Sequence, residues 1–228
     1  ADLMRERDIA VAPWVDTMLE KGIESFYQTD NGRVIGVYNP AASAYTALAR
    51  PAGVIVLDDL RAQGKELARN ESASLLDLGD GVLCFEFHSK VNSLDPLIME
   101  MGYKALELLK DDQWVGMVIG NQSTDFCAGA NLGVVMMGVA SGKADQVSQF
   151  TKGMQQLFMK FRTSPKPVVA APYGRVLGGG AEISLASARR VAAAETYIGL
   201  VELGVGIVPG WGGCKEFVRR QISPHMAA

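Results

Sequence analysis

Three consecutive glycines, Gly178, Gly179 and Gly180, lie between a strand-like run and a helical run. A helix that begins there has N–H groups that no helical carbonyl accepts, and without side chains a ligand can approach them closely. Such donors suit a phosphate or a developing oxyanion. The same glycines also suit a tight turn that needs positive φ, so both interpretations stay open.

A second loop of small residues spans 126–132, between a buried strand and an apolar, helical run. Cys127, Ala128, Gly129 and Ala130 leave the main-chain N–H groups of this loop within reach of a ligand. A merely compact loop fits the same residues. The loop becomes informative only together with the triple glycine.

Two acids stand in apolar surroundings. Glu182 follows the glycines, and Glu202 lies between Val201 and Leu203. Burial of a carboxylate among apolar groups raises its pKa, and two neighbouring acids can divide the roles of acid and base. The alternative is that each acid is solvated at a helix start, where the helix dipole favours glutamate.

Other chemistries have little support in the residues. Histidine chemistry would depend on His88 or His225, and no HExxH occurs. The three cysteines, Cys84, Cys127 and Cys214, form no CxxC, which argues against a zinc site or a disulfide framework and favours a reducing cytoplasm. The sequence contains no GxGxxG and no P-loop, so a dinucleotide fingerprint is absent from these residues.

Composition narrows the class of protein further. The 228 residues are 48% apolar and 21% charged, and the net charge of −3 disfavours nucleic acid as a partner. The densest apolar stretch, 132–140, is far shorter than the roughly 20 residues of a membrane helix. Glycine, at 25 residues, exceeds its usual share of about 7%, which indicates close backbone approaches.

Alternating patterns from Glu71 onward predict a layered α/β fold of βαβ units. Short apolar runs predict strands at 81–87, 115–120, 166–172 and 190–193. Helical spacing of apolar residues predicts helices at 97–109, 147–161 and 181–188, the first of them capped by Asp95 before Pro96. The glycine-rich segment 206–213 reads as a rigid turn in which Trp211 serves packing.

The N-terminal residues have a different pattern. Pro13 opens a predicted helix that stops near Gly22, and Asn31-Gly32 predicts a hairpin that Asn39-Pro40 ends. Residues 41–70 read as a connection with a short helix at 60–68. A helix and one hairpin bury too little to stand alone, so we expect them to pack on another domain.

Five segments, taken in order over residues 75–219, resemble the crotonase (enoyl-CoA hydratase/isomerase) superfamily. They are 89–94 (SKVNSL), 126–132 (FCAGANL), 166–171 (KPVVAA), 177–182 (LGGGAE) and 199–213 (GLVELGVGIVPGWGG). Each segment is weak alone, and their shared order makes the resemblance strong. It implies an α/β, crotonase-like (ClpP/crotonase) layered ββα superhelix, truncated at the C-terminus and preceded by the helix-plus-hairpin remnant.

The start of the chain looks like the end of a 3-hydroxyacyl-CoA dehydrogenase region, as in bacterial bifunctional β-oxidation proteins. The resemblance therefore implies two parts. Residues 1–70 would be the tail of a dehydrogenase helical region with a linker, and 71–228 an enoyl-CoA hydratase core without its C-terminal helices. The chain would be a fragment of a longer polypeptide.

The resemblance also assigns site residues. The backbone N–H groups of Ala130 and Gly179 would form the oxyanion hole for the thioester carbonyl, and Glu182 and Glu202 would hold water and shuttle protons. The expected CoA- and substrate-binding residues are Ser89, Lys90, Val91, Ala128, Asn131, Leu132, Gly133 and Gly178. Three positions depart from the family pattern: Asn131 where many members carry Asp, Val201 where many carry Pro, and Trp211 where the residue is often small.

The activity implied is addition of water to trans-2-enoyl-CoA in cytoplasmic fatty-acid β-oxidation. Hydration would need no cofactor and no metal, and NAD is expected only in the dehydrogenase domain. The implied partners are an acyl-CoA substrate and a homotrimer built through the C-terminal helices, with no nucleic acid and no membrane insertion. The alternatives are an enoyl-CoA isomerase, other crotonase chemistry, or an acyl-CoA-binding domain without catalysis.

Overall fold

The computed structural model describes residues 2–30, 33–49 and 53–220. The chain divides into two compact units, Ala1–Gln63 and Gly64–Ala228. The described residues contain no helix that combines the length and the apolar character needed to cross a membrane.

The first unit is a three-stranded antiparallel sheet with short helices. Trp14 packs against Phe26 and Tyr38, with ring centroids 5.6 and 6.1 Å apart. The predicted helix at Pro13 is confirmed, and so is the antiparallel pairing of the two strands, although Asn31 and Gly32 lie outside the described residues. The elements are α1 (Asp2–Arg5), α2 (Pro13–Glu20), β1 (Tyr27–Asp30), β2 (Arg33–Asn39), β3 (Ala44–Ala47) and α3 (Leu57–Ala62).

The second unit is built on a six-stranded sheet in the order β10-β8-β7-β6-β5-β4. The strands β6, β7, β8 and β10 run parallel, whereas β4, β5 and β6 pair antiparallel. A second, two-stranded parallel sheet joins β9 to β11. The strands are β4 (Glu66–Arg69), β5 (Ala73–Asp77), β6 (Val82–Phe87), β7 (Gly116–Ile119), β8 (Val168–Ala170), β9 (Arg175–Leu177), β10 (Arg189–Arg190) and β11 (Tyr197–Gly199).

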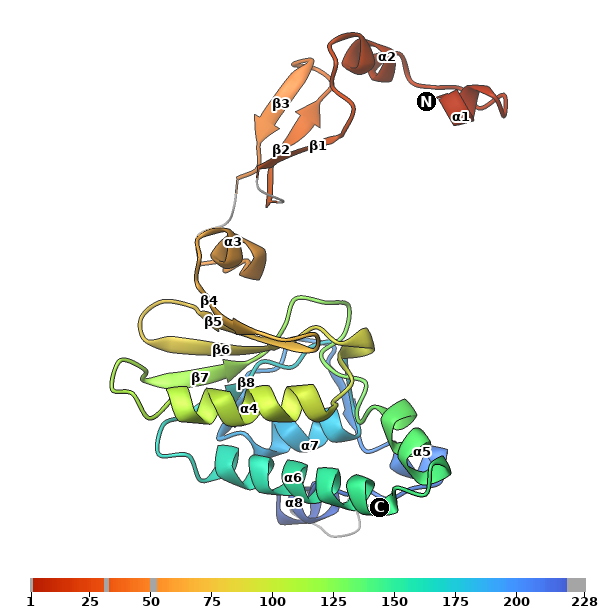
Figure 1. Ribbon diagram of the computed structural model, residues 1–228. Helices are drawn as coiled ribbons and strands as arrows, with labels where there is room; N and C mark the ends of the chain where they lie inside the picture. The colour runs from red at the N-terminus through yellow and green to blue at the C-terminus, as the bar shows by residue number, and fades with distance from the viewer. Residues whose placement is uncertain (1, 31–32, 50–52, 221–228) are drawn as a thin grey trace. The chain divides into compact units, whose positions relative to one another are not determined.

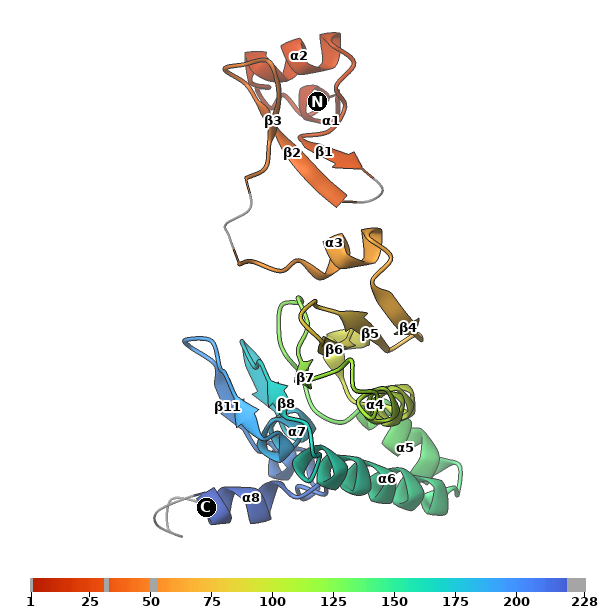
Figure 2. The same cartoon turned by 90° about the vertical axis from the view of Figure 1, so that its left-hand side faces the viewer.

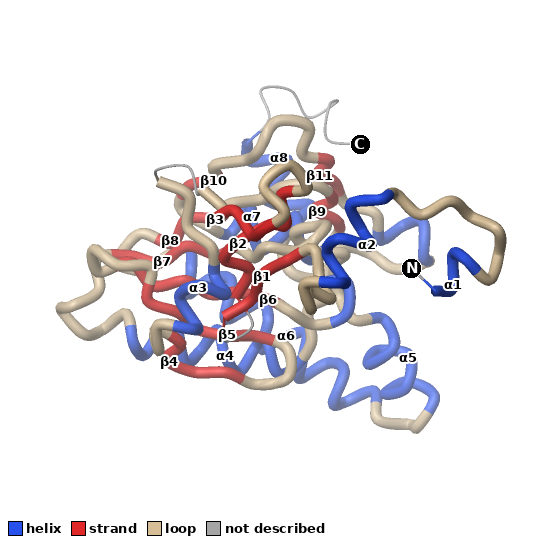
Figure 3. The backbone as a smooth tube through the Cα atoms, turned by 90° about the horizontal axis from the view of Figure 1, so that it is seen from above, coloured by secondary structure: helices blue, strands red, loops and turns tan. Residues whose placement is uncertain are grey.

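Helices cover one face of this sheet in two layers (Figures 1 and 2). The helices α4 (Pro96–Leu108) and α7 (Gly179–Ala186) contact the strands, and α6 (Ala144–Arg162) packs on both of them. The helix α8 (Gly213–Arg220) contacts α7. The helix α5 (Leu132–Ala140) contacts α6 and lies to one side of the layers, as the tube in Figure 3 shows.

Apolar side chains between the sheet and the helices form the core. The α6 stripe predicted from spacing is confirmed: Phe150, Met154, Leu157, Phe158 and Phe161 are all buried. Each side chain of this kind that is withdrawn from water stabilises the fold by about 1.5–3 kcal/mol. The cap of α4 is confirmed as well, since Oδ1 of Asp95 accepts the N–H of Ile98 at 2.9 Å.

The predicted connection at 41–70 is wrong in part. Residues 66–69 form β4, which pairs with β5, and the helix predicted at 60–68 is α3, Leu57–Ala62. Because β4 belongs to the sheet, the units divide after Gln63, whereas we expected a boundary at residue 70. The strand predicted at 190–193 lies at Arg189–Arg190.

Candidate active site

The triple glycine is a strand-to-helix turn in which each glycine is needed. Gly178 has φ 50° and ψ −118°, a conformation that side chains rarely adopt, and α7 begins at Gly179. A Cβ on Gly178 would lie 2.8 Å from Oε1 of Glu202, and one on Gly180 would lie 2.7 Å from Cβ of Cys127. The segment is therefore a tight turn with positive φ at Gly178, and it is also a place where other groups come close to the backbone.

Two backbone N–H groups lie close together at this turn. A Cβ on Gly179 would be only 3.4 Å from the backbone nitrogen of Ala130. Among the described residues, neither the N–H of Ala130 nor the N–H of Gly179 has a hydrogen-bond acceptor. Two unpaired N–H groups of this kind can donate hydrogen bonds to the same negatively charged oxygen.

The loop that carries Ala130 is held from both sides. The N–H of Leu94 donates to the carbonyl of Gly129, and the N–H of Asn131 donates to the carbonyl of Leu94, each at 2.8 Å. The thiol of Cys127 accepts the N–H of Gly129 at 3.3 Å. Burial raises the pKa of this thiol to about 12, so Cys127 stays protonated and serves as a neutral support.

Parallel strands bring the two acids to one place. β9 runs directly into Gly178 and α7, and β11 leads to the short 3-10 helix η2 (Glu202–Val205). The N–H of Gly178 donates to the carbonyl of Gly199 at 2.9 Å, which fixes the ends of the two strands together. Glu182, in the first turn of α7, and Glu202, at the start of η2, therefore line the same cavity.

Glu182 is held by backbone donors although it is almost fully buried. Only 3% of the residue is exposed, and Oε1 accepts the N–H groups of Trp211 and Gly213, both at 2.8 Å. Burial is the largest influence on this carboxyl and raises its pKa, and the charge of Glu202 acts in the same direction. The two N–H groups act against the rise without cancelling it.

Glu202 is buried as well, with 8% of the residue exposed. Its Oε2 has no hydrogen-bond partner in the part of the chain that the structure describes. A buried polar atom without a partner is costly, so this oxygen is placed to bond a group that enters the cavity.

The cavity around the two acids has a volume of about 700 Å³. Its walls are mostly aliphatic, and Trp211 closes one side, where the ring packs against Gly179 between Phe150 and Phe158. The packing role predicted for Trp211 is confirmed. The lining comprises Ala130, Leu132, Val135, Val147, Thr151, Gly179, Glu182, Glu202, Leu203, Gly206, Ile207, Val208, Gly210 and Trp211.

A smaller cavity of about 310 Å³ adjoins the larger one, since Ala130 and Leu132 line both. It is the place where the structure brings together most of the residues expected to bind CoA. Its lining comprises Lys90, Val91, Ser93, Ala128, Ala130, Asn131 and Leu132.

Three of the expected binding residues lie elsewhere. The hydroxyl of Ser89 donates to the carbonyl of Ser93 at 2.7 Å, which shapes the loop. Gly133 is the second residue of α5 and lines neither cavity, and Gly178 lies against the carboxyl of Glu202. These three residues therefore do not line the smaller cavity with the other expected binding residues.

Sequence reasoning missed the backbone groups that hold Glu182. The N–H groups of Trp211 and Gly213 come from a turn and a helix start that we interpreted only as a rigid turn. Residues 210–213 (GWGG) ahead of a helix are the available signal, because a helix start offers free N–H groups to an acid.

Comparisons with known proteins agree on one family. Residues 78–228 match the family model described as enoyl-CoA hydratase/isomerase. The chain is 43% identical over 219 residues to a Bacillus subtilis protein named as a 3-hydroxyacyl-CoA dehydrogenase, over 94% of this chain and 27% of that protein. It is 32% identical over 162 residues to a Rickettsia felis protein named as a fatty acid oxidation complex trifunctional enzyme, over 71% of this chain and 22% of that protein.

Solved structures show the same fold. A crystal structure of an enoyl-CoA hydratase from Polaromonas matches with a TM-score of 0.64 and 27% identity, over 68% of this chain and 60% of that one. An enoyl-CoA hydratase from Bacillus anthracis matches with a TM-score of 0.61 and 26% identity, over the same shares of the two chains. The chain spans about a quarter of the length of the two relatives named above.

Proposed function

Because the chain belongs to the enoyl-CoA hydratase/isomerase family, we propose that its second unit adds water to trans-2-enoyl-CoA and forms 3-hydroxyacyl-CoA. One observation carries this proposal: two unpaired backbone N–H groups and two buried carboxyls line a single, largely aliphatic cavity. The N–H groups suit the negative charge that would develop on the thioester oxygen, and the carboxyls suit the proton transfers.

The proposed reaction begins at the thioester carbonyl. Attack of water on the β-carbon shifts electrons through the conjugated system and places negative charge on the carbonyl oxygen. The N–H groups of Ala130 and Gly179 would hold that oxygen, and one such donor typically contributes about 2.7–4 kcal/mol to catalysis. The dipole of α7, whose positive end is at Gly179, also stabilises this negative charge.

The two carboxyls would complete the proton balance. One, ionised, accepts a proton from the attacking water, and the other, protonated, delivers a proton to the α-carbon. The raised pKa of Glu182, to which the charge of Glu202 contributes, supports a division of acid and base roles between the two carboxyls. Because Oε1 of Glu182 is held by two N–H groups, Oε2 is the oxygen that would exchange the proton.

CoA would lie along the smaller cavity. Lys90 there offers an ammonium group that suits a phosphate of the CoA moiety, and Asn131 and Leu132 border the entrance to the acyl cavity. The aliphatic walls of the larger cavity suit a hydrocarbon chain.

The biological setting is also a proposal. The names of the two relatives support a fatty-acid β-oxidation polypeptide that also carries a 3-hydroxyacyl-CoA dehydrogenase. NAD would serve that dehydrogenase part, and hydration itself would use only water and the protein's own groups. A homotrimer and a cytoplasmic location complete the proposal, and sedimentation of the full-length protein tests the trimer.

Product analysis tests the reaction. The full-length protein is given a trans-2-enoyl-CoA and, separately, a 3-enoyl-CoA of the same length. A hydratase converts the first into 3-hydroxyacyl-CoA, whereas an isomerase converts the second into the conjugated 2-enoyl-CoA. Binding of both thioesters in calorimetry without any product would identify a binding domain and refute the proposal.

A further inference from the structure

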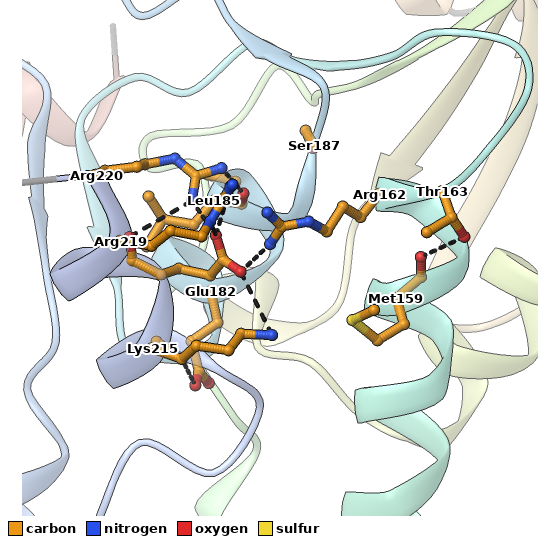
Figure 4. Close-up of polar contacts among 12 residues, drawn as sticks. Met159, Arg162, Thr163, Glu182, Leu185, Ser187, Lys215, Arg219 and Arg220 are labelled. Carbon is orange, nitrogen blue, oxygen red and sulfur yellow. Dashed lines mark hydrogen bonds and ion pairs between the residues drawn. The ribbon is translucent and has the colours of Figure 1, made fainter.

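A buried acid outside the cavity lies at the centre of a cluster of cations. Glu216, in α8, is 4% exposed. Its Oε1 pairs with Arg162 from the end of α6, and its Oε2 pairs with Arg220 and, at 3.1 Å, with Arg219. Figure 4 shows the three arginine side chains pointing toward one another from α6 and α8. Lys215 is exposed and lies 3.5 Å from Oε1. We define the Glu216 cluster as these five residues.

The positive side chains of the Glu216 cluster all pair with one negative charge, that of Glu216. Burial lowers the pKa of Arg162, and the charges of Arg219 and Arg220 lower it further, so these groups repel one another. Glu216 offsets both effects by accepting from all of them. Removal of the buried acid from this cluster leaves the arginine charges uncompensated, which destabilises the packing of the elements that carry them.

The helix that carries Glu216 also holds Glu182. Gly213, the first residue of α8, and Trp211 donate their N–H groups to Oε1 of Glu182. At the other end of α8, Arg220 donates to the carbonyl of Leu185, near the end of α7, at 2.6 Å. Contacts at both ends therefore fix α8 on α7, and Glu216 ties its centre to α6.

Close packing at the start of α8 also restricts the position of Glu182. A Cβ on Gly213 would lie 3.0 Å from Cγ of Glu182, so α8 begins in direct contact with the acid. Glu182 and Glu216 both line a further cavity of about 410 Å³, between α6 and α8. A small displacement of α8 would therefore change the position of the Glu182 carboxyl.

We propose that Glu216 is a positioning residue, which ties α8 to α6 through Arg162 and to α7 through Arg220, so that the N–H groups of Trp211 and Gly213 hold Oε1 of Glu182. The inference rests on the proposed function for its effect on catalysis. Its structural part, the hold on residues 211–213, stands apart from the reaction.

The expected kinetic effect is specific to Glu182. In Glu216→Gln, the N–H groups are held less firmly, so kcat for hydration of a 2-enoyl-CoA falls by about tenfold or more. KM stays within about twofold because the residues of the CoA cavity are untouched. The pKa of Glu182 rises further, so the limb of the pH profile that Glu182 governs moves to higher pH.

The experiment uses the full-length protein and four variants. Glu216→Gln and Arg162→Gln break the cluster separately, and the double variant replaces the ion pair with a neutral one and guards against a folding defect. Lys215→Gln is the matched control, because it removes an exposed cation of the same cluster. Kinetics, the pH profile and hydrogen exchange of the 211–213 amides by mass spectrometry are compared.

The inference predicts faster exchange at 211–213 and lower kcat in Glu216→Gln, and wild-type behaviour in Lys215→Gln. Unchanged exchange and an unchanged pH profile in a folded Glu216→Gln protein would overturn it and leave only a structural ion pair. If the wild-type protein hydrates no enoyl-CoA, the proposed function fails, and the exchange measurement still decides the inference.

Discussion

Oε1 of Glu182 accepts the backbone N–H of Trp211 at 2.8 Å, while the ring of Trp211 packs against Gly179. One residue therefore contacts both the acid and the donor of the proposed oxyanion hole. This link couples the position of the Glu182 carboxyl to that of the Gly179 N–H, two groups that the proposed reaction uses together. Variation at this turn is expected to affect both groups together.

The stability of the protein should depend on pH through Glu182. Because burial raises the pKa of this carboxyl, its ionisation costs more in the folded state, and wild-type stability is lost as pH rises through the folded pKa. Glu182→Gln cannot ionise and keeps an acceptor for both N–H groups. Its Tm relative to wild type should increase from about pH 4 to about pH 8.

Thermal unfolding across this pH range measures the effect. Gly199→Ala changes no ionisable group and is the control whose Tm difference should stay constant. A Tm difference for Glu182→Gln that shrinks with rising pH would show that ionisation of Glu182 stabilises the fold.

Gly179→Ala should damage both the fold and the reaction. The new Cβ would lie 2.4 Å from Cζ3 of Trp211 and would approach the nitrogen of Ala130 at 3.4 Å. Overpacking of this kind costs about 1–3 kcal/mol, and the methyl group would occupy space that the thioester oxygen needs. Denaturant unfolding and hydration kinetics measure the two effects.

Gly199→Ala provides the comparison for that substitution, because a Cβ at Gly199 meets no atom within 4 Å. Gly199→Ala should leave both the free energy of unfolding and the hydration rate within error of wild type. Equal activity of Gly179→Ala and Gly199→Ala would remove Gly179 from the oxyanion hole.

The fold was predictable from the sequence where apolar spacing is regular over several turns or where a strand is wholly apolar. The helices α4 and α6 and the strand β7 are examples. β9 and β11 were missed because each has three residues, too few to show a period. The helix α8 was also missed, because its sequence is mostly polar and it is stabilised by its contacts with α7.

The candidate site was predictable to the level of residue types. The glycines and the two acids are visible because each chemical role restricts the residue type, whereas Ala130, which supplies only a backbone N–H, was assigned through the family resemblance. The hold on Glu182 has only the weak signal of residues 210–213, since any residue at 211 or 213 except proline supplies an N–H group. The ion pair between Glu216 and Arg162 joins residues 54 apart, and only the packing of both α6 and α8 on α7 brings them together.

Thiol reactivity should distinguish the cysteines. Cys127 is buried and its pKa is raised to about 12, so it presents no thiolate at neutral pH. Cys84 is buried too, whereas Cys214 is exposed. In the native protein, an alkylating reagent should label Cys214 alone among these three, and mass spectrometry of peptides identifies the site. Rapid labelling of Cys127 without denaturant would contradict the packed loop.

Lys90→Ala should weaken binding of the substrate while leaving the chemical step intact. Lys90 lines the smaller cavity, away from both acids, so KM for an enoyl-CoA should rise several-fold with kcat unchanged. The corresponding enoyl-pantetheine, which lacks the phosphates of CoA, should show no difference between variant and wild type. A KM increase that is equal for both thioesters would exclude a phosphate contact at Lys90.

The central claim is that Glu182 and Glu202 act together on one substrate. Hydration of crotonyl-CoA, followed as the loss of conjugated absorbance, tests it most directly in the full-length protein and in Glu182→Gln and Glu202→Gln. Each substitution is expected to lower kcat by about 10²–10⁴-fold with little change in KM. A wild-type rate in either folded variant would contradict the account.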